Sequence, residues 1–376
     1  MRYRLTIISI FVLSFITGNL AAGVFEKLQS PAAVHVYGGS YSDSTAFSLP
    51  FRYSKNTSTA NVVPLGMTIG VRINTDGVMV LGTGGFLGED GQTHNPSEGI
   101  LKGGDLILKA NEKPINSKEC LSRLVSDTTG DITLLLRRNG NEIEVTLTPE
   151  VAATDGTRKI GTWVRDSTKG IGTLTYYIPE TGAFGALGHG IMDVDTRMLI
   201  TVRNGVVMPS TVTSIVKGAR GKPGELEGTV DSQKSLGKVL LNSPSGIYGT
   251  LSQDFIETLP KETMPTATRA QIREGPATIL TNVVGNKVRE FDISIEGVNR
   301  TTTDETKGMI IRITDPALLE ATNGIVQGMS GSPIIQNGRL VGAVTHVFVQ
   351  DPTKGYGVFI ETMLQQEATV QVSPLL

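Results

Sequence analysis

The chain has 376 residues, of which 39% are hydrophobic and 19% charged, so it can form a packed core and about two or three domains. A net charge of −2 gives no reason to expect a nucleic-acid partner. The one cysteine, Cys120, excludes an internal disulfide and argues against a thiolate zinc site. We therefore expect no metal and no cofactor. The 44 glycines and many short runs of Val, Ile and Thr favour turn-rich β structure.

Residues 1–22 have the layout of a secretory signal peptide. Positive charge in residues 1–4 precedes an apolar run over 5–20, and small residues follow. The run is short for a membrane span, which takes about 20 residues, so cleavage is favoured over a permanent N-terminal anchor. We expect the rest of the chain to act outside the cytoplasm.

Residues 23–61 form a mixed N-terminal segment. Positions 40–60 are rich in Ser, Thr, Asn and Tyr, which predicts an exposed linker. Exposed linkers are preferred sites of proteolysis, so this segment is a candidate cleavage site.

Residues 62–149 predict a compact β unit with one helix near 120–125. The phrase EGILKGGDLILKANEKPI, residues 98–115, resembles the pattern of PDZ domains. That resemblance implies that Leu65, Gly66, Met67 and Thr68 form a carboxylate-binding loop. Its N–H groups would capture a peptide C-terminus, and the next strand would pair with the peptide. The alternative is a β unit that only packs on its neighbour.

A polar connector over 150–158 leads to residues 159–376, which we treat as one domain. Short β-type runs and few long amphipathic helices predict an all-β barrel or double barrel. The expected fold is therefore mostly β: a PDZ domain followed by a barrel domain.

A serine at Ser330 lies in the glycine-rich sequence GMSGSP, residues 328–333, just before a hairpin marked by Asn337-Gly338. Such a turn suits an oxyanion hole, for which we predict the N–H groups of Gly328 and Ser330. The glycine-rich pattern around Ser330 also fits the nucleophile elbow of α/β-hydrolases, but that motif needs a helix after the serine, and β-type residues follow here. An inert serine on a structural turn remains the alternative.

A nucleophilic serine needs a base and a group that orients the base. His189 stands among glycines, where packing does not explain it, so it is the predicted base. His346 lies in a hydrophobic strand and is interpreted as a packed residue, while His35 and His94 fall outside this domain.

The acid has three candidates, Asp193, Asp195 and Asp315. The first two are close to His189 in sequence, whereas Asp315 opens a short helix 15 residues before Ser330. Asp315 is also a good helix N-cap, so its spacing from Ser330 does not decide which of the three aspartates is the acid. His-before-Ser order in a β domain is the pattern of chymotrypsin-like proteases.

The segments FGALGHGIMDVDT (184–196) and GMSGSP (328–333) resemble the stage IV sporulation protein B family, PDZ-containing serine peptidases of endospore-forming bacteria. The resemblance implies a triad of His189, Asp315 and Ser330. It also implies export into the forespore intermembrane space, with or without membrane association. There the peptidase would cleave itself and a membrane-bound regulator of an intramembrane protease, which would let a late sigma-factor precursor be processed.

Two other functions stay open at the level of sequence. A PDZ scaffold with an inactive protease-like β domain would need neither His189 nor Ser330, and an esterase could use the same triad.

Overall fold

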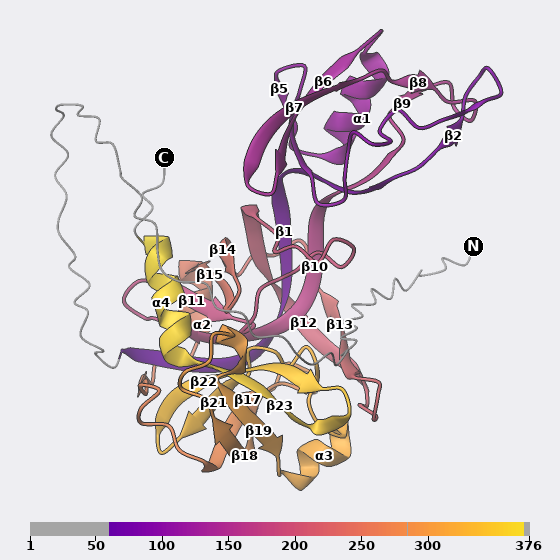
Figure 1. The fold of residues 1–376 in the computed structure, drawn as a ribbon. Coiled ribbons are helices and arrows are strands. Elements are labelled where there is room, and N and C mark those ends of the chain that lie inside the picture. The colour runs from indigo at the N-terminus through magenta and orange to yellow at the C-terminus, as the bar shows by residue number, and fades with distance from the viewer. Residues whose placement is uncertain (1–59, 284, 372–376) are drawn as a thin grey trace, which may run out of the picture. The chain divides into compact units, whose positions relative to one another are not determined.

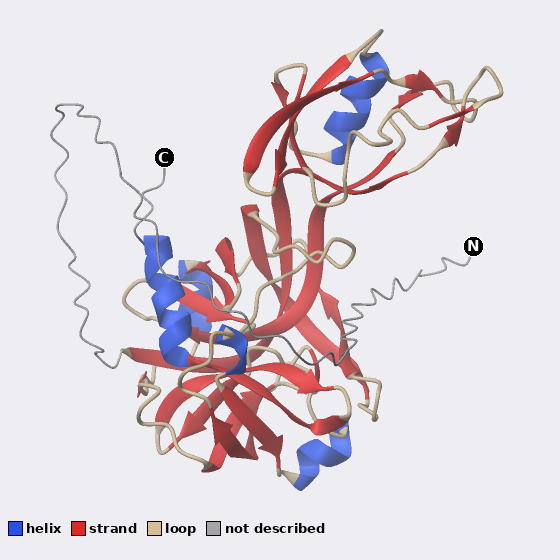
Figure 2. Cartoon of the chain, viewed as in Figure 1, coloured by secondary structure: helices blue, strands red, loops and turns tan. Residues whose placement is uncertain are grey.

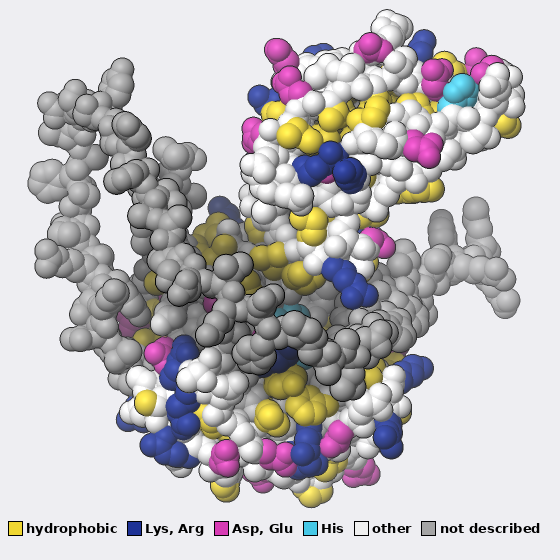
Figure 3. Space-filling view, viewed as in Figure 1, with side chains coloured by type: hydrophobic (Ala, Val, Ile, Leu, Met, Phe, Trp, Pro, Cys, Tyr) yellow, Lys and Arg dark blue, Asp and Glu magenta, His cyan; other side chains and the backbone are white. Residues whose placement is uncertain are grey.

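The computed structural model describes residues 60–283 and 285–371, most of which lie in strands joined by short turns (Figures 1 and 2). The predicted signal segment and nearly all of the predicted linker lie outside these residues. No helix within the described part is long and apolar enough to cross a membrane. Figure 3 shows Lys and Arg interspersed with Asp and Glu over the viewed face, in keeping with the small net charge.

The PDZ unit has its own hydrophobic core. Val78 and Val80 pack with Ile107, Leu134 and the helix residue Leu121. Helix α1 begins after Ser117, whose side chain accepts the Cys120 N–H at 3.1 Å. The elements of this unit are β2 (Phe86–Leu87), β3 (Thr93–His94), β4 (Leu106–Ala110), β5 (Lys113–Pro114), α1 (Lys118–Asp127), β6 (Ile132–Arg138), β7 (Asn141–Leu147), β8 (Glu150–Val151) and β9 (Arg158–Lys159).

Six strands close the first barrel. Pairings run β1–β10–β11–β15–β14–β12, and β12 pairs back to β1. The strands are β1 (Asn61–Thr83), β10 (Thr162–Tyr177), β11 (Ala183–Ala186), β15 (Gly246–Leu251), β14 (Gly237–Ser243) and β12 (Val202–Val216). Attached to it are β13 (Gly224–Val230), α2 (Gln253–Thr258), β16 (Met264–Pro265) and β20 (Val326–Gln327).

Six further strands close the second barrel, in the order β17–β18–β19–β23–β22–β21. Its core includes Ile279, Ile293, Ile311 and Val344, all buried. The elements are β17 (Gly275–Thr281), β18 (Arg289–Val298), η1 (Glu305–Lys307), β19 (Met309–Ile313), α3 (Pro316–Thr322), β21 (Pro333–Gln336), β22 (Arg339–Phe348), β23 (Asp351–Phe359) and α4 (Ile360–Gln371). The predicted fold class, mostly β with a PDZ unit and a barrel domain, is confirmed, as is the hairpin at Asn337-Gly338.

The domain boundaries differ from those predicted. Strands β1 and β10 pair antiparallel from Val63↔Tyr177 to Thr83↔Thr162, so both run through the first barrel and the PDZ unit. Val63, Leu65 and Ile69 belong to the barrel core, whereas Val78 and Val80 belong to the PDZ core. The predicted PDZ start at 62 therefore falls in the barrel, because β1 continues through the Asn74–Gly77 irregularity, where the two cores meet, and its first half belongs to the barrel.

The predicted carboxylate-binding loop is placed differently as well. Leu65, Gly66, Met67 and Thr68 lie inside β1, where Met67 and Thr68 pair with β10. Leu65 is buried, and the Thr68 hydroxyl donates to the Asn282 carbonyl at 3.3 Å. Gly66 marks a shift in strand register rather than a loop. It fits because a Cβ there would lie 2.7 Å from Leu280. The four residues are thus part of the barrel wall and present no peptide-binding loop.

Candidate active site

Ser330 lies on the turn between β20 and β21. Gly328 and Gly331 on either side have φ of +98° and +96°, which L-residues with a Cβ rarely adopt. A Cβ on Gly331 would lie 2.2 Å from the Thr173 carbonyl oxygen, so the turn presses directly against β10. The second barrel thus brings Ser330 onto the first.

The carbonyl groups of the turn are held by one residue of β10. The Thr173 N–H donates to the Ser330 carbonyl at 2.9 Å, and the Thr173 hydroxyl donates to the Gly328 carbonyl at 2.7 Å. No hydrogen bond joins the Ser330 N–H to another residue of the described chain. This leaves the N–H available for the predicted oxyanion role.

The hydroxyl of Ser330 donates to the Thr345 carbonyl at 2.7 Å. Thr345 lies on β22 where the register against β23 shifts between Val344 and Val347, so Thr345 and His346 form a β-bulge. The Thr345 hydroxyl in turn donates to the Thr306 carbonyl at 2.8 Å. In this state the serine hydroxyl is directed to β22, and it is half-buried.

His189 follows β11 on a tight turn that packs on the same bulge. A Cβ on Gly188 would lie 3.1 Å from both Thr345 and Val358 side chains, so the turn sits close against β22 and β23. The half-buried His189 ring places Nδ1 3.0 Å from the Gly190 carbonyl, which can only accept. Nδ1 therefore carries the proton and Nε2 is the free acceptor, as a general base requires. Burial lowers the pKa of His189, against the opposing effect of the Gly190 hydrogen bond.

The ring of His346 faces that of His189, with centroids 4.8 Å apart and planes inclined at 32°. Sequence reasoning took His346 for a packed strand residue, yet it is exposed. Leu340 to Thr345 of β22 are all buried, and the bulge turns the next residue, His346, outward, which no pattern in the sequence indicated.

The three candidate acids all have other partners. Asp315 caps α3 and accepts the Ala317 and Leu318 N–H groups at 2.9 and 3.0 Å. Asp193 is buried and Arg165 bridges it to Asp195, whose carboxylate lies 2.8 Å from the guanidinium. Burial acts to raise the pKa of Asp193, but hydrogen bonds from Thr196 and Arg165 outweigh it and hold the pKa below its usual range. Within the described residues none of the three carboxylates hydrogen-bonds to His189, so the fold brings together the turns that carry the predicted base and nucleophile but not the acid.

Asn242 is a residue that sequence reasoning missed. Its amide accepts the Ile191 N–H and donates to the Ile191 and Ile200 carbonyls, each at 2.8 Å. It thereby fixes the segment that follows His189. Its place at the end of an apolar run, directly after Leu241, was the only signal, and it did not point to this task.

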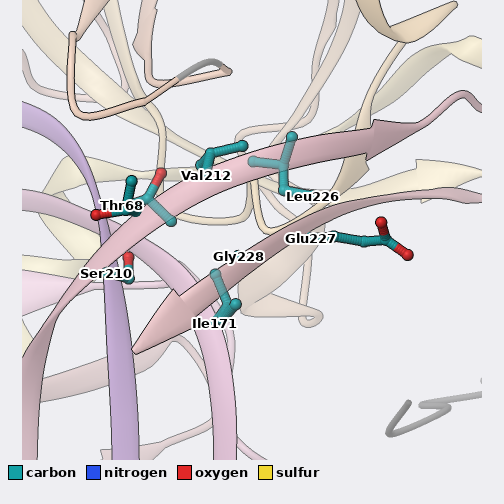
Figure 4. Close-up of a pocket in the computed structure, with 8 residues that line it drawn as sticks. Thr68, Ile171, Ser210, Val212, Leu226, Glu227 and Gly228 are labelled. Carbon is teal, nitrogen blue, oxygen red and sulfur yellow. The ribbon is translucent and has the colours of Figure 1, made fainter. Parts of the chain in front are cut away.

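A small depression lies beside the serine turn (Figure 4). Leu226 separates it from Gly328, since a Cβ on that glycine would lie 3.1 Å from the leucine. It leaves no room for even one water-sized sphere, so it is not a ligand pocket. The lining residues are Thr68, Ile171, Ser210, Thr211, Val212, Leu226, Glu227 and Gly228.

A serine and a histidine on turns of two abutting six-stranded barrels define a serine endopeptidase of the chymotrypsin-like class. A family model described as SpoIVB peptidase S55 matches residues 156–364, more than half of the chain. The chain therefore belongs to the SpoIVB peptidase family and is a serine peptidase of sporulation. A peptidase acts on protein or peptide substrates.

Solved structures are similar over parts of the chain. The PDZ domain of the SdrC-like protein from Listeria monocytogenes is 17% identical, covers 24% of this chain and 90% of its own, and gives a TM-score of 0.20. The active form of the Rv3671c protease from M. tuberculosis is 16% identical, covers 56% of this chain and 77% of its own, and gives a TM-score of 0.35. The HtrA-type protease AlgW with a decapeptide is 12% identical, covers 58% of this chain and 57% of its own, and gives a TM-score of 0.31. No curated protein matches the chain.

Proposed function

We propose that this peptidase is exported to the forespore intermembrane space and acts there as a signalling protease. It cleaves itself and a membrane-bound regulator of an intramembrane protease, and the second cut permits processing of a late sigma-factor precursor. Family membership supports this role. The observation that carries the chemistry is that the turns of His189 and Ser330 meet at one bulge, Thr345.

In this mechanism Ser330 Oγ attacks the peptide carbonyl while His189 Nε2 takes its proton. Rotation about χ1 of Ser330 exchanges the hydrogen bond to Thr345 for one to the imidazole, a change expected when substrate binds. The N–H groups of Ser330 and Gly328 donate hydrogen bonds to the carbonyl oxygen and stabilise the negative charge that develops on it. His189 then gives its proton to the leaving amine.

Replacement of Ser330 by Ala tests the nucleophile. We expect self-cleavage and labelling by a fluorophosphonate to fall by about 10⁴-fold or more, because the other hydroxyl of this turn, on Ser332, is fully buried and cannot form the acyl-enzyme. The measurement is mass spectrometry of the incubated protein, and the fragment ends also test whether the cut lies in residues 40–60.

Ser332→Ala is the matched control. This serine lies two positions further on, is fully buried, and its Oγ has no hydrogen-bond partner in the described structure. It should label at the wild-type rate. Self-cleavage that persists in Ser330→Ala would place the nucleophile elsewhere. An inert wild type with intact β structure would favour a PDZ scaffold.

We infer that the PDZ unit binds a peptide segment, either of a substrate or of another copy of the chain. Its separate hydrophobic core supports an independent binding role. Since Leu65–Thr68 are part of the barrel wall, the peptide must use other residues of the unit. A screen of C-terminal peptides against the whole Ser330→Ala protein tests this, and uniform lack of binding would contradict it.

A further inference from the structure

The contact between His189 and His346 joins the two barrels at the active site. His189 comes from the turn after β11 in the first barrel, and His346 from β22 in the second. The 4.8 Å separation and 32° inclination of the rings are those of an offset aromatic pair. Within the described residues no hydrogen bond joins the two rings, so His189 Nδ1 keeps its bond to Gly190 and Nε2 keeps its lone pair.

The backbone of His346 is held firmly for an exposed residue. It shares the bulge with Thr345, whose carbonyl accepts the Ser330 hydroxyl and whose own hydroxyl is bonded to Thr306. On the other side β23 presses close, since a Cβ on Gly355 would lie 2.5 Å from the His346 carbonyl oxygen. The bulge therefore fixes the position of the ring relative to the nucleophile.

Three charged or titratable groups act on this ring: His189, Asp304 at the N-cap of η1, and Lys307 in η1. Asp304 and Lys307 pair with each other at 2.8 Å. Burial of the ring, followed by repulsion from His189 and Lys307, lowers the pKa of His346 to about 4, against the opposing effect of Asp304. A neutral His346 lies against His189 without charge repulsion at neutral pH.

We propose that His346 is a positioning residue of this peptidase, whose ring forms the wall against which the His189 imidazole is held facing Ser330. The inference rests on the proposed roles of His189 and Ser330. Within the described chain His189 has one hydrogen bond, to Gly190, and no carboxylate partner. One hydrogen bond leaves the ring free to rotate about that bond, and the His346 face removes this freedom. Loss of such orientation by about 1 Å typically costs about 10²-fold in rate.

The experiment compares His346→Ala, which removes the wall, with His346→Phe, which keeps an aromatic face but no ring nitrogen. The probe is a fluorophosphonate, and its rate constant for labelling is measured from pH 4 to 9 beside the rate of self-cleavage. We expect His346→Ala to label about 10- to 100-fold more slowly. The acid limb of its pH profile should move toward the pKa of an ordinary histidine, because His189 becomes more exposed to solvent. His346→Phe should recover most of the rate.

His94→Ala is the matched control, because that histidine lies in the PDZ unit and pairs with Asp90 at 2.9 Å, remote from both barrels in the pairing order. It should label as wild type. If His346→Ala unfolds, the folded His346→Phe decides: a rate near wild type supports the wall, and a deep loss overturns it.

Equal rates and pH profiles for wild type and His346→Ala would overturn the positioning role and leave the proposed function standing. A wild type that neither labels nor cleaves itself, while folded, would instead overturn the proposed function together with this inference.

Discussion

His189 illustrates how the fold sets the chemistry of a single residue. Its turn presses on Thr345 and Val358, so the ring is half-buried, and its Nδ1 proton is committed to Gly190. Burial disfavours the imidazolium and lowers the pKa below the ordinary 6.5. The base is therefore neutral and ready under conditions where an exposed histidine would be partly protonated.

The acid limb of activity should accordingly lie below pH 6.5. The rate depends on neutral His189, and its lowered pKa keeps that form populated as the pH falls. Fluorophosphonate labelling of the wild type from pH 4 to 8 measures the midpoint. A midpoint at or above 6.5 would mean that His189 is not the titrating base.

Stability should also fall as acid is added. Both His189 and His346 have folded pKa values below 6.5, so the unfolded chain binds protons that the folded chain does not. This stability is present above pH 6.5 and is lost progressively as the pH falls toward about 4. Urea unfolding at pH 7 and pH 5 measures it. His346→Phe should show a smaller difference between the two pH values than wild type, and an equal difference would contradict the assignment to His346.

At the scale of elements, α3 and the serine turn carry the residues whose roles the chain order suggested. Asp315 caps α3 through two N–H groups, and the helix leads into β20 and Ser330. The cap explains the aspartate without any catalytic task, whereas the family resemblance assigns it the task of the acid.

Two substitutions of Asp315 separate these roles. Asp315→Ala removes the cap and should cost about 1 kcal/mol in the free energy of unfolding, while Asp315→Asn keeps a good cap and should cost little. If Asp315 only caps the helix, Asp315→Asn should label like wild type. A loss of at least 10²-fold in a stable Asp315→Asn, with Asp193→Asn and Asp195→Asn less affected, would restore Asp315 as the acid.

Gly331→Ala should disable the serine turn. The added Cβ would lie 2.2 Å from the Thr173 carbonyl oxygen and 2.5 Å from the Leu187 nitrogen, at a φ of +96°. Strain at such a position is of order 1 to 3 kcal/mol, and the turn must move off β10 to relieve the contact. We expect a lower melting temperature and strongly reduced labelling. Gly338→Ala, at a turn with open space around it, should lose stability but keep labelling.

At the scale of the whole described chain, β1 and β10 unite the PDZ unit and the first barrel. Val63, Leu65, Ile69, Val71 and Ile73 of β1 are all buried in the barrel core. A peptidase domain that begins at residue 159 would therefore lack one of the six strands of its barrel and these apolar side chains.

We expect a fragment of residues 159–376 to lack fixed tertiary structure. By contrast, a chain in which an Asn-Gly turn replaces residues 81–163 keeps the β1–β10 pairing and the Arg165–Asp193 ion pair, and should fold. Near-ultraviolet circular dichroism and thermal melts compare the two. A fragment that melts as sharply as the turn-closed chain would show that β1 is dispensable.

Much of this protein could be predicted from local sequence. The Asn337-Gly338 hairpin, the Asp315 cap of α3 and the β-rich barrel domain follow from turn chemistry, capping and short apolar runs, which act over a few neighbouring residues. The motifs around His189 and Ser330 also marked both residues, because glycine-rich turns with a lone functional side chain are poorly explained by packing.

Only the tertiary structure decided where the chain divides and what surrounds the site. The Asp76-Gly77 turn signal in β1 does not reveal that residues on its two sides enter different cores, because the chain continues in the same strand and the cores are completed by residues remote in sequence. The bulge at Thr345 and His346 lies in the local hairpin of β22 and β23, but its contacts with the Gly188 turn and with the Ser330 hydroxyl come from the tertiary fold. Local residue patterns determine which turns and strands form, whereas contacts across more than a hundred residues determine which side chains meet.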